Sequence, residues 1–415
     1  MINNNFKISN NMTTIKNFST LTTVLLLFMV INLVSCTKEN KDGENPKKEG
    51  ELVGSITDTK SLDSTITYTI TGPVIVEDGA TLNIPAGTMI KAKKGFNNYI
   101  LVLQGGKINV RGTADKPVTM TANISDAQPG HWGGLIINGR APLAGGTIGS
   151  TEISSAFPYG GTKADDNSGT ITYLTIEYPG ARSSADVEHN GLTLNGVGNG
   201  TTIENIFIRY SADDGVEFFG GNVNVKNLLV VDSDDDMFDF TQGYTGKLEN
   251  AYGIWQAGYT STEADPRGIE ADGNFDGNFP THTGQSDFTV KNVTFDLRLA
   301  KSADVDVTNV KDKMLDVIKI RRGAKINVEN ALLKGTGTVV DLIDFTDGKG
   351  AGNPLSTISL TNSLVNTNLG KSINFNATQL YNGVNEFGTD VSKLKIEAGN
   401  TGCSNSIFTW TKYAF

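Results

Sequence analysis

The chain repeats itself at a short interval. The segment Ser211–Phe218 (SADDGVEF) matches Ser233–Phe240 (SDDDMFDF), which lies 22 residues further on. Short apolar runs around and after these copies carry an asparagine at a matching place: Asn205, Asn227, Asn250, Asn292, Asn330 and Asn362. A unit of about 22 residues cannot bury an apolar face alone, but stacked units share one continuous core. A chain with this repeat is therefore constrained to a solenoid.

The polarity pattern inside each repeat predicts strands. Short segments alternate between apolar and polar residues and are separated by Gly, Asn and Asp, as in short strands joined by turns. Leucine-rich repeats share the period but require a Leu spacing that is absent, and an ordinary β-sandwich would not repeat in register. The sequence therefore predicts an all-β fold, a right-handed parallel β-helix of about 22–23 residues per coil, with the asparagines hydrogen-bonded from coil to coil.

Residues 51–415 show no domain boundary and are expected to form a single β-helix domain. Two Gly-rich stretches, near 141–170 and 256–288, interrupt the repeat and are predicted to be loop insertions. Loops on solenoids gather on one face and often shape a binding site.

The N-terminal segment has the pattern of an export signal. An apolar run at residues 24–31 ends in the sequence LVSC at residues 33–36. About ten apolar residues suit a signal peptide and are too few to span a bilayer. LVSC resembles a bacterial lipobox, so we expect residues 1–35 to be a lipoprotein signal peptide and Cys36 to carry the lipid. A plain signal peptide is the alternative, and Met12 is a second candidate start.

The run at residues 36–50 is charged and poor in apolar residues, so we expect a disordered tether. Together with the lipid, it implies a membrane-attached, outer-membrane lipoprotein. The acidic and lysine residues just after Cys36 resemble surface-export signals, which favours exposure on the cell surface. The sequence leaves the periplasmic and the outer face open.

The charge of the chain excludes one class of partner. It has 35 Lys and Arg against 45 Asp and Glu, a formal net charge of −10, and no basic cluster. Such a chain repels phosphate backbones, so we expect no nucleic-acid partner. Of its two cysteines, Cys36 is assigned to the lipid. Cys403 is then left without an intrachain partner and is expected to be a packed side chain.

The repeat places carboxylates one above another. In the strand Val216–Phe218, alternation turns the two apolar side chains inward and Glu217 outward. One coil on, Asp239 stands between two phenylalanines, and the segment at 268–270 looks like the next coil. We therefore expect the carboxylates of Glu217, Asp239 and Glu270 in one row, about 5 Å apart. Like charges at that distance repel by about 3 kcal/mol at an effective dielectric of about 20, so the row requires compensation.

Three kinds of compensation are open. Ca²⁺ accepts several oxygen ligands in loose geometry, and the candidate metal ligands are Asp213, Asp214, Asp235 and Asp236. The same aspartates could instead cap backbone amides in turns. Arginines could also supply the positive charge, and those nearby are Arg182, Arg209 and Arg267.

Several motifs stand in an order that resembles a known family. They are WGGLIINGRAPL at 132–143, PYGG at 158–161, DNSG at 166–169, LTIEYPG at 174–180, HNGLTLNGVGNGTTIENI at 189–206 and SADDGVEFFGG at 211–221. Over roughly residues 70–255 the chain resembles secreted or lipid-anchored β-helix proteins that are common in Bacteroidetes and mostly uncharacterised. More distantly, its architecture is similar to pectate-lyase-like carbohydrate enzymes, although a fold does not imply a function.

A catalytic function has partial support. Asp213-Asp214 resembles the Asp-Asp pair of polygalacturonase-like β-helices, and paired carboxylates suit glycoside hydrolysis. A calcium-dependent lyase would use an Arg or Lys as base. The candidate catalytic residues are Asp213, Asp214, Asp236 and Arg209. The Gly-His-Gly turn of those enzymes is absent, and residues 319–321 reverse their Arg-Ile-Lys order. A zinc site is disfavoured because the histidines lack ligand spacing: His131, His189 and His282.

The sequence therefore favours a surface lipoprotein that binds a ligand, most plausibly a glycan, together with Ca²⁺. The expected binding residues are the carboxylates Glu217, Asp239 and Glu270 and the aromatic Tyr210, Tyr244 and Trp255, since aromatic rings stack on sugar rings. One alternative is a calcium-dependent polysaccharide lyase or glycoside hydrolase. Another is a structural or adhesive protein, or a partner of an outer-membrane transporter.

Overall fold

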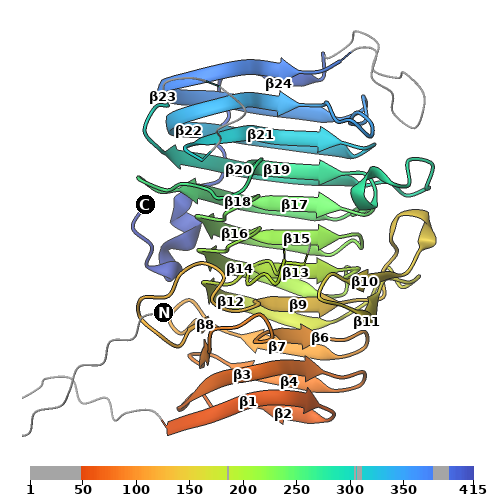
Figure 1. Cartoon of the computed structure of the whole chain (residues 1–415), viewed down its shortest axis with the longest axis vertical. Coiled ribbons are helices and arrows are strands. Elements are labelled where there is room, and N and C mark those ends of the chain that lie inside the picture. Colours follow the sequence, from red (N-terminus) through yellow and green to blue (C-terminus); the bar gives the residue numbers. More distant parts are fainter. Residues whose placement is uncertain (1–47, 185–186, 303–304, 306–310, 377–391) are drawn as a thin grey trace, which may run out of the picture. The chain divides into compact units, whose positions relative to one another are not determined.

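The chain forms a parallel β-helix in which each coil stacks on the next (Figure 1). The computed structural model describes residues 48–184, 187–302, 305, 311–376 and 392–415. Strands of successive coils pair in parallel throughout the main sheet. The predicted fold class, a right-handed parallel β-helix, is confirmed.

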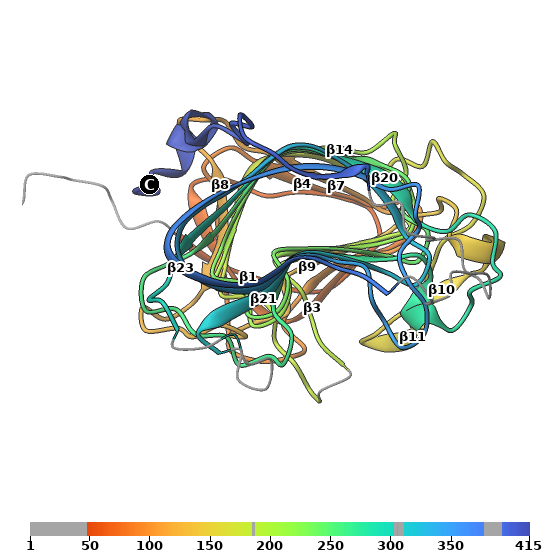
Figure 2. The same cartoon turned by 90° about the horizontal axis from the view of Figure 1, so that it is seen from above.

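Three parallel sheets surround one core (Figure 2). The first sheet contains the short strands β2 (Thr59–Ser61), β4 (Thr81–Pro85), β7 (Lys107–Arg111) and β24 (Leu394–Ile396). The second contains β5 (Met89–Ala92) and β8 (Val118–Ala122). The third contains β6 (Ile100–Val102), β9 (Leu135–Asn138), β13 (Leu192–Asn195), β15 (Val216–Phe219), β17 (Phe238–Thr241), β19 (Arg267–Asp272) and β21 (Lys313–Arg321).

Longer strands bend from one sheet into the next. They are β1 (Lys48–Ile56), β3 (Ile66–Val76), β12 (Gly169–Glu177), β14 (Thr202–Arg209), β16 (Asn224–Val231), β18 (Lys247–Trp255), β20 (Asp287–Arg298), β22 (Lys325–Asp344) and β23 (Thr357–Asn374). Strand β12, for example, pairs with β7 through its first half and with β8 through its second half.

The bend between the first and second sheets holds the predicted asparagine ladder. In five successive coils the bend residue is an asparagine with φ between 53° and 60°, the left-handed conformation that Asn tolerates. The five asparagines are Asn205, Asn227, Asn250, Asn292 and Asn330. The side-chain amide of each of the last four donates to the Oδ1 of the asparagine before it at 2.8–2.9 Å, and Asn205 accepts the first of these bonds. Asn362 is not part of the ladder, because its Oδ1 accepts from its own neighbour, the backbone N–H of Leu364. The ladder is therefore confirmed for five of the six asparagines.

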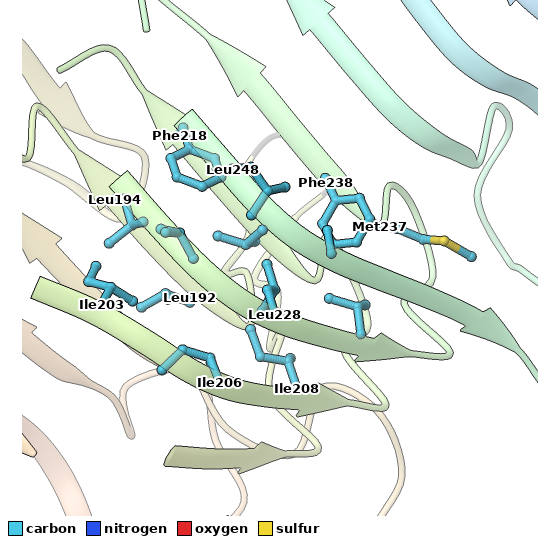
Figure 3. Close-up of a cluster of buried hydrophobic side chains, with 14 of the residues drawn as sticks. Leu192, Leu194, Ile203, Ile206, Ile208, Phe218, Leu228, Met237, Phe238 and Leu248 are labelled. Atoms are coloured by element: carbon cyan, nitrogen blue, oxygen red, sulfur yellow. The ribbon is translucent and has the colours of Figure 1, made fainter. Parts of the chain in front are cut away.

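Inward-facing apolar side chains fill the interior (Figure 3). Phe218 and Phe240, one coil apart, stack with ring centroids 4.7 Å apart and planes 12° from parallel. Phe240 stacks in turn on Phe288 at 4.3 Å. The predicted inward orientation of Phe218 and Phe240 is confirmed.

The insertions lie at the edges of the third sheet. The first, near 141–170, contains the 3-10 turn η1 (Ala144–Gly146) and the antiparallel hairpin β10 (Gly149–Thr151)–β11 (Ser154–Tyr159). The second prediction, 256–288, is wrong as one loop, because strand β19 lies inside it. Ile269 and Ala271 face the core in register with the preceding coil, so pairing outweighs the Gly-rich composition. The true loops are 256–266 and 273–286, the latter carrying η2 (Phe275–Gly277).

The C-terminal residues return along the outside of the second sheet. The 3-10 segment η3 (Asn405–Thr411) inserts Phe408 and Trp410 against outward side chains of β14, β16 and β18. Cys403 is buried in the same cluster and has no disulfide partner among the described residues.

The N-terminal predictions fall mostly on residues 1–47, which lie outside the described residues. The signal peptide and the lipidated Cys36 therefore stay predictions. The predicted tether ends earlier than residue 50, because Lys48–Gly50 already pair with β3. In the described part of the chain, no helix has the length and apolar character needed to cross a membrane.

Candidate functional site on the third sheet

The pleat of the third sheet places the predicted carboxylate row. Val216 and Phe218 point into the core, so Glu217 between them points out. Strand pairing sets Glu217 beside Asp239, Asp239 beside Glu270, and Glu270 beside Lys319. The predicted register of the three carboxylates is confirmed.

The turns that enter the third sheet add more carboxylates. Asp213 and Asp214 precede β15, and Asp235 and Asp236 precede β17. Carboxylate oxygens lie within 4.8 Å of one another in three overlapping groups: Asp213–Asp214–Asp235, Asp214–Glu217–Asp239 and Asp236–Asp239–Glu270. We call these seven residues the acidic cluster.

Burial governs the electrostatics of the acidic cluster. It raises the pKa of Asp213, Asp214, Glu217 and Asp236 well above the ordinary range, and neighbouring carboxylates raise these pKa values further. The pKa of Asp235 is raised to about 7, chiefly by burial and against the opposing charge of Arg267. The cluster therefore favours either bound protons or another positive charge.

Arginines compensate one end of the acidic cluster. Arg267 is buried and contacts Glu270, as well as Asp265 at 2.6 Å and Asp316 at 3.1 Å. Arg321 also contacts Glu270. Glu270 thus has two guanidinium partners, and the predicted role of Arg267 in charge compensation is confirmed.

In the part of the chain that the structure describes, the rest of the acidic cluster has no cationic partner. Among the described residues, no Lys, Arg or His nitrogen lies within 4.0 Å of a carboxylate oxygen of these six: Asp213, Asp214, Glu217, Asp235, Asp236 and Asp239. The neighbouring group Asp316–Asp341–Asp344 differs, because Lys319 and Arg267 pair with it.

Hydrogen bonds satisfy only part of the acidic cluster. Asn190 donates its side-chain N–H to Glu217 at 2.6 Å, and Asp214 accepts the backbone N–H of Asp236 at 2.9 Å. Turn capping is therefore confirmed for Asp214. One buried carboxylate oxygen each of Asp235, Asp236 and Asp239 has no hydrogen-bond partner among the described residues. Such a set of unsatisfied carboxylate oxygens fits a hard cation such as Ca²⁺.

The rim of the site is acidic as well. Glu152, an exposed residue of the β10–β11 hairpin, has its pKa raised to about 7 by desolvation of its carboxylate and by Glu188, Asp239 and Asp276. Arg182 pairs there with Glu188 at 3.0 Å and Glu263 at 2.6 Å. The positive charge of Arg182 is therefore compensated by carboxylates of the rim.

Two of the predicted aromatic ligand contacts are wrong. Tyr244 and Trp255 are 0% and 1% exposed and lie in the core. Their polar atoms bond inside the protein, Tyr244 to the Val223 carbonyl at 2.7 Å and Trp255 to the Ser233 carbonyl at 3.3 Å. The alternation of apolar and polar residues did not predict that these two side chains are buried, because both follow bends at which the inward-facing set of residues changes.

Arg209 and Tyr210 lie away from the carboxylate row. Arg209 ends β14, on the second sheet, and pairs with Glu177 at 2.6 Å. The Tyr210 ring stacks on the Tyr178 ring with centroids 5.2 Å apart, and the Arg209 guanidinium lies over the Tyr210 ring. The structure therefore does not bring Arg209 to the acidic cluster as a base.

Sequence reasoning missed several side chains at the site. Asn190 and Arg321 touch the row, yet each comes from a different coil than its partner. Only the strand register between coils could have identified them. Once Lys319 is aligned with Glu270, Arg321 lies two residues further along β21, on the same outward face of the sheet. The exposed aromatic residues Phe275 and Phe279 in the second insertion carried no repeat signal at all.

The comparison with known families agrees with this geometry. The pectate-lyase-like beta helix domain matches residues 54–414, nearly the whole described chain. The chain belongs to the pectate-lyase-like beta helix domain family. The match extends well beyond the 70–255 over which sequence motifs carried the resemblance. A search of curated proteins finds no match to the chain.

Proposed function

We propose that this pectate-lyase-like β-helix binds a glycan on its third sheet, with Ca²⁺ held by the acidic cluster. The observation that carries the proposal is the set of six buried or half-buried carboxylates on two adjacent coils that have no cationic partner within 4.0 Å in the described part of the chain. The family supports a carbohydrate-related role. Ligands of the ion would come from Asp213, Asp214, Asp235, Asp236, Glu217 and Asp239, and Ca²⁺ is well suited to such an oxygen-only set.

The chain's own residues would prepare the site for an extended ligand. Outward positions line up on five coils from Ile136 through Thr193, Glu217, Asp239 and Glu270. Insertions flank both edges of this strip, so a glycan would lie along the stack and between them. Bound Ca²⁺ would supply free coordination positions for sugar hydroxyl or carboxylate oxygens.

The test incubates the purified protein with insoluble acidic and neutral polysaccharides, in Ca²⁺ and in chelator. Binding should deplete the protein from solution in Ca²⁺ and be lost in chelator. The variant Asp239→Asn should lose the depletion, while Asp287→Asn, an exposed residue paired with Lys325 on the first sheet, should keep it. Absence of depletion on every polysaccharide would overturn the proposal and favour a protein partner, such as an outer-membrane transporter.

A lyase is the second candidate function, favoured by one observation. The pKa of Arg321, beside Glu270, is lowered to about 10 by burial and by Arg267 and Arg322. In a lyase, this guanidinium beside Glu270 would serve as the Arg base. New chain ends with the ultraviolet absorbance of an unsaturated sugar, lost in Arg321→Lys, would establish a lyase. New reducing ends without that absorbance would indicate a hydrolase.

We also propose membrane attachment through Cys36, on the LVSC sequence that precedes the tether. In cell fractionation, Cys36→Ser should move the protein from the membrane to the soluble fraction. Cys403→Ser is the matched control, since that thiol is buried, and it should leave the distribution unchanged. A membrane-bound Cys36→Ser protein would contradict the proposal.

A further inference from the structure

A pocket lies where the third sheet turns towards the first, between the two insertions. Its volume is about 280 Å³, and its lining includes Ile148, Tyr159, Gln242, Phe275, Phe279 and His282. Gln242 directly follows β17, the strand that carries Asp239, so the pocket lies beyond the C-terminal end of that strand. At the small end of ligand pockets, which span about 300–1,000 Å³, it suits a single ring rather than a chain.

The walls of the pocket are held together by contacts between the insertions. The backbone N–H of Gly145 donates to the Thr283 carbonyl at 2.7 Å, and Tyr159 donates its hydroxyl to Gln242 at 2.7 Å. Gly145 has φ of +71°, and a Cβ there would lie 2.4 Å from the His282 ring. The close approach of the two loops therefore requires glycine, and the pocket is pre-formed.

Aromatic rings are exposed in this pocket. Phe275 and Phe279 are 38% and 43% exposed, and Ile148 is 62% exposed. Phe279 stacks on His282 with centroids 4.6 Å apart and planes 9° from parallel, so His282 supports one face of the Phe279 ring. Large apolar side chains gathered at one concave place on a surface indicate a ligand.

The charge around the pocket selects against anions. Among the described residues that line it, none is Lys or Arg. The uncompensated charge near it is negative: the carboxylates of Glu217 and Glu152 raise the pKa of the lining residue Tyr159. Asp276, which follows Phe275 in η2, is paired with Arg322 at 3.7 Å. A ligand with an apolar face for the Phe279 ring and neutral hydroxyls for Gln242 and Ser150 fits this lining.

We propose that the pocket between the insertions is a subsite for one uncharged sugar ring, stacked on the exposed Phe279 ring, which His282 supports from behind. This inference rests on the proposed glycan-binding function and deepens it, since it specifies a glycan with neutral residues. The sugar bound beside Asp239 would be the neighbouring unit of the same glycan.

The experiment measures binding of neutral and acidic oligosaccharides by isothermal titration calorimetry, and Ca²⁺ binding separately. We expect Phe279→Ala to weaken binding of neutral oligosaccharides about tenfold, the value of one lost ring contact. Phe279→Trp should restore it. Ca²⁺ affinity should not change in either variant. Phe415→Ala, an equally exposed phenylalanine at the C-terminus, is the matched control and should bind like the original protein.

The outcomes separate the inference from the proposed function. Unchanged neutral-glycan binding in Phe279→Ala, or binding of acidic oligosaccharides only, overturns the subsite and leaves glycan binding in place. If the original protein binds no oligosaccharide, the proposed function fails and the subsite fails with it. A loss in Phe279→Ala with equal loss of Ca²⁺ affinity would show a damaged fold and overturn a ring-specific contact.

Discussion

At the scale of single residues, Asp239 is the most informative position because it belongs to two carboxylate groups and keeps one oxygen unpartnered. In chelator, Asp239→Asn should raise the free energy of unfolding by about 1–3 kcal/mol, since it removes one of several buried like charges. In Ca²⁺ the variant should lose most of the stabilisation that the ion gives the original protein. Denaturant unfolding in both conditions measures the two effects, and a variant less stable in chelator would contradict the first.

The pH dependence of stability follows from the raised pKa values of the cluster. A carboxyl whose folded pKa exceeds its unfolded value makes the folded protein bind more protons, so stability falls as pH rises between the two values. For Asp235 this interval runs from the ordinary 3.8 to about 7. In chelator, the original protein should therefore lose stability relative to Asp235→Asn as pH increases from about 4 to 7. Parallel melting-temperature profiles for the two proteins would refute this expectation.

At the scale of the element, the asparagine ladder connects the coils at the bend of the first and second sheets. Asn227 donates to Asn205 and accepts from Asn250, and its φ is 59°. Asn227→Ala loses both hydrogen bonds and strains the left-handed backbone, so we expect a loss of about 2–4 kcal/mol. Asn227→Gly keeps the backbone conformation and should lose only about 1–2 kcal/mol.

Chemical denaturation of the two Asn227 variants distinguishes conformation from hydrogen bonding. Equal losses in Ala and Gly would mean that the left-handed backbone contributes nothing to the preference for asparagine. A negligible loss in both would mean that strand pairing alone holds the coils in register.

At the scale of the whole molecule, the C-terminal segment ties several coils together from outside. Phe408 packs beside Phe207, Leu229 and Tyr252 of three successive coils. Burial also raises the pKa of the Cys403 thiol to about 12, which keeps it unreactive. Phe408→Ala should cost about 3–5 kcal/mol and expose Cys403. Thiol labelling of Cys403 in a Cys36→Ser background measures this exposure. If Phe408→Ala is labelled as slowly as the protein with Phe408, the C-terminal segment does not hold the coils together in this way.

Much of the fold could be predicted from the sequence because, in a solenoid, residues that contact each other are separated by a nearly fixed number of residues. Residues 22 apart become neighbours in adjacent coils, so matching segments predict the pairing of β15 with β17 and the stacking of Phe218 on Phe240. The same rule set Glu217 beside Asp239, and the similar segment at 268–270, beyond a loop, added Glu270 to the row. Local repetition determined these features since only nearest-neighbour coils are involved.

The tertiary structure alone decided which side chains reach the site. At each bend between sheets, the set of alternate residues that faces the core changes. For this reason Tyr244 and Trp255 are buried, and Arg209 lies on the second sheet, away from the carboxylate row. Arg321 contacts Glu270 because their strands are neighbours in the third sheet, although an insertion separates the two residues in the sequence. The pocket of Phe279 and His282 exists because two insertions, more than a hundred residues apart, meet at one corner. Repetition encodes contacts between coils, whereas loops meet only through their shared place on the folded stack.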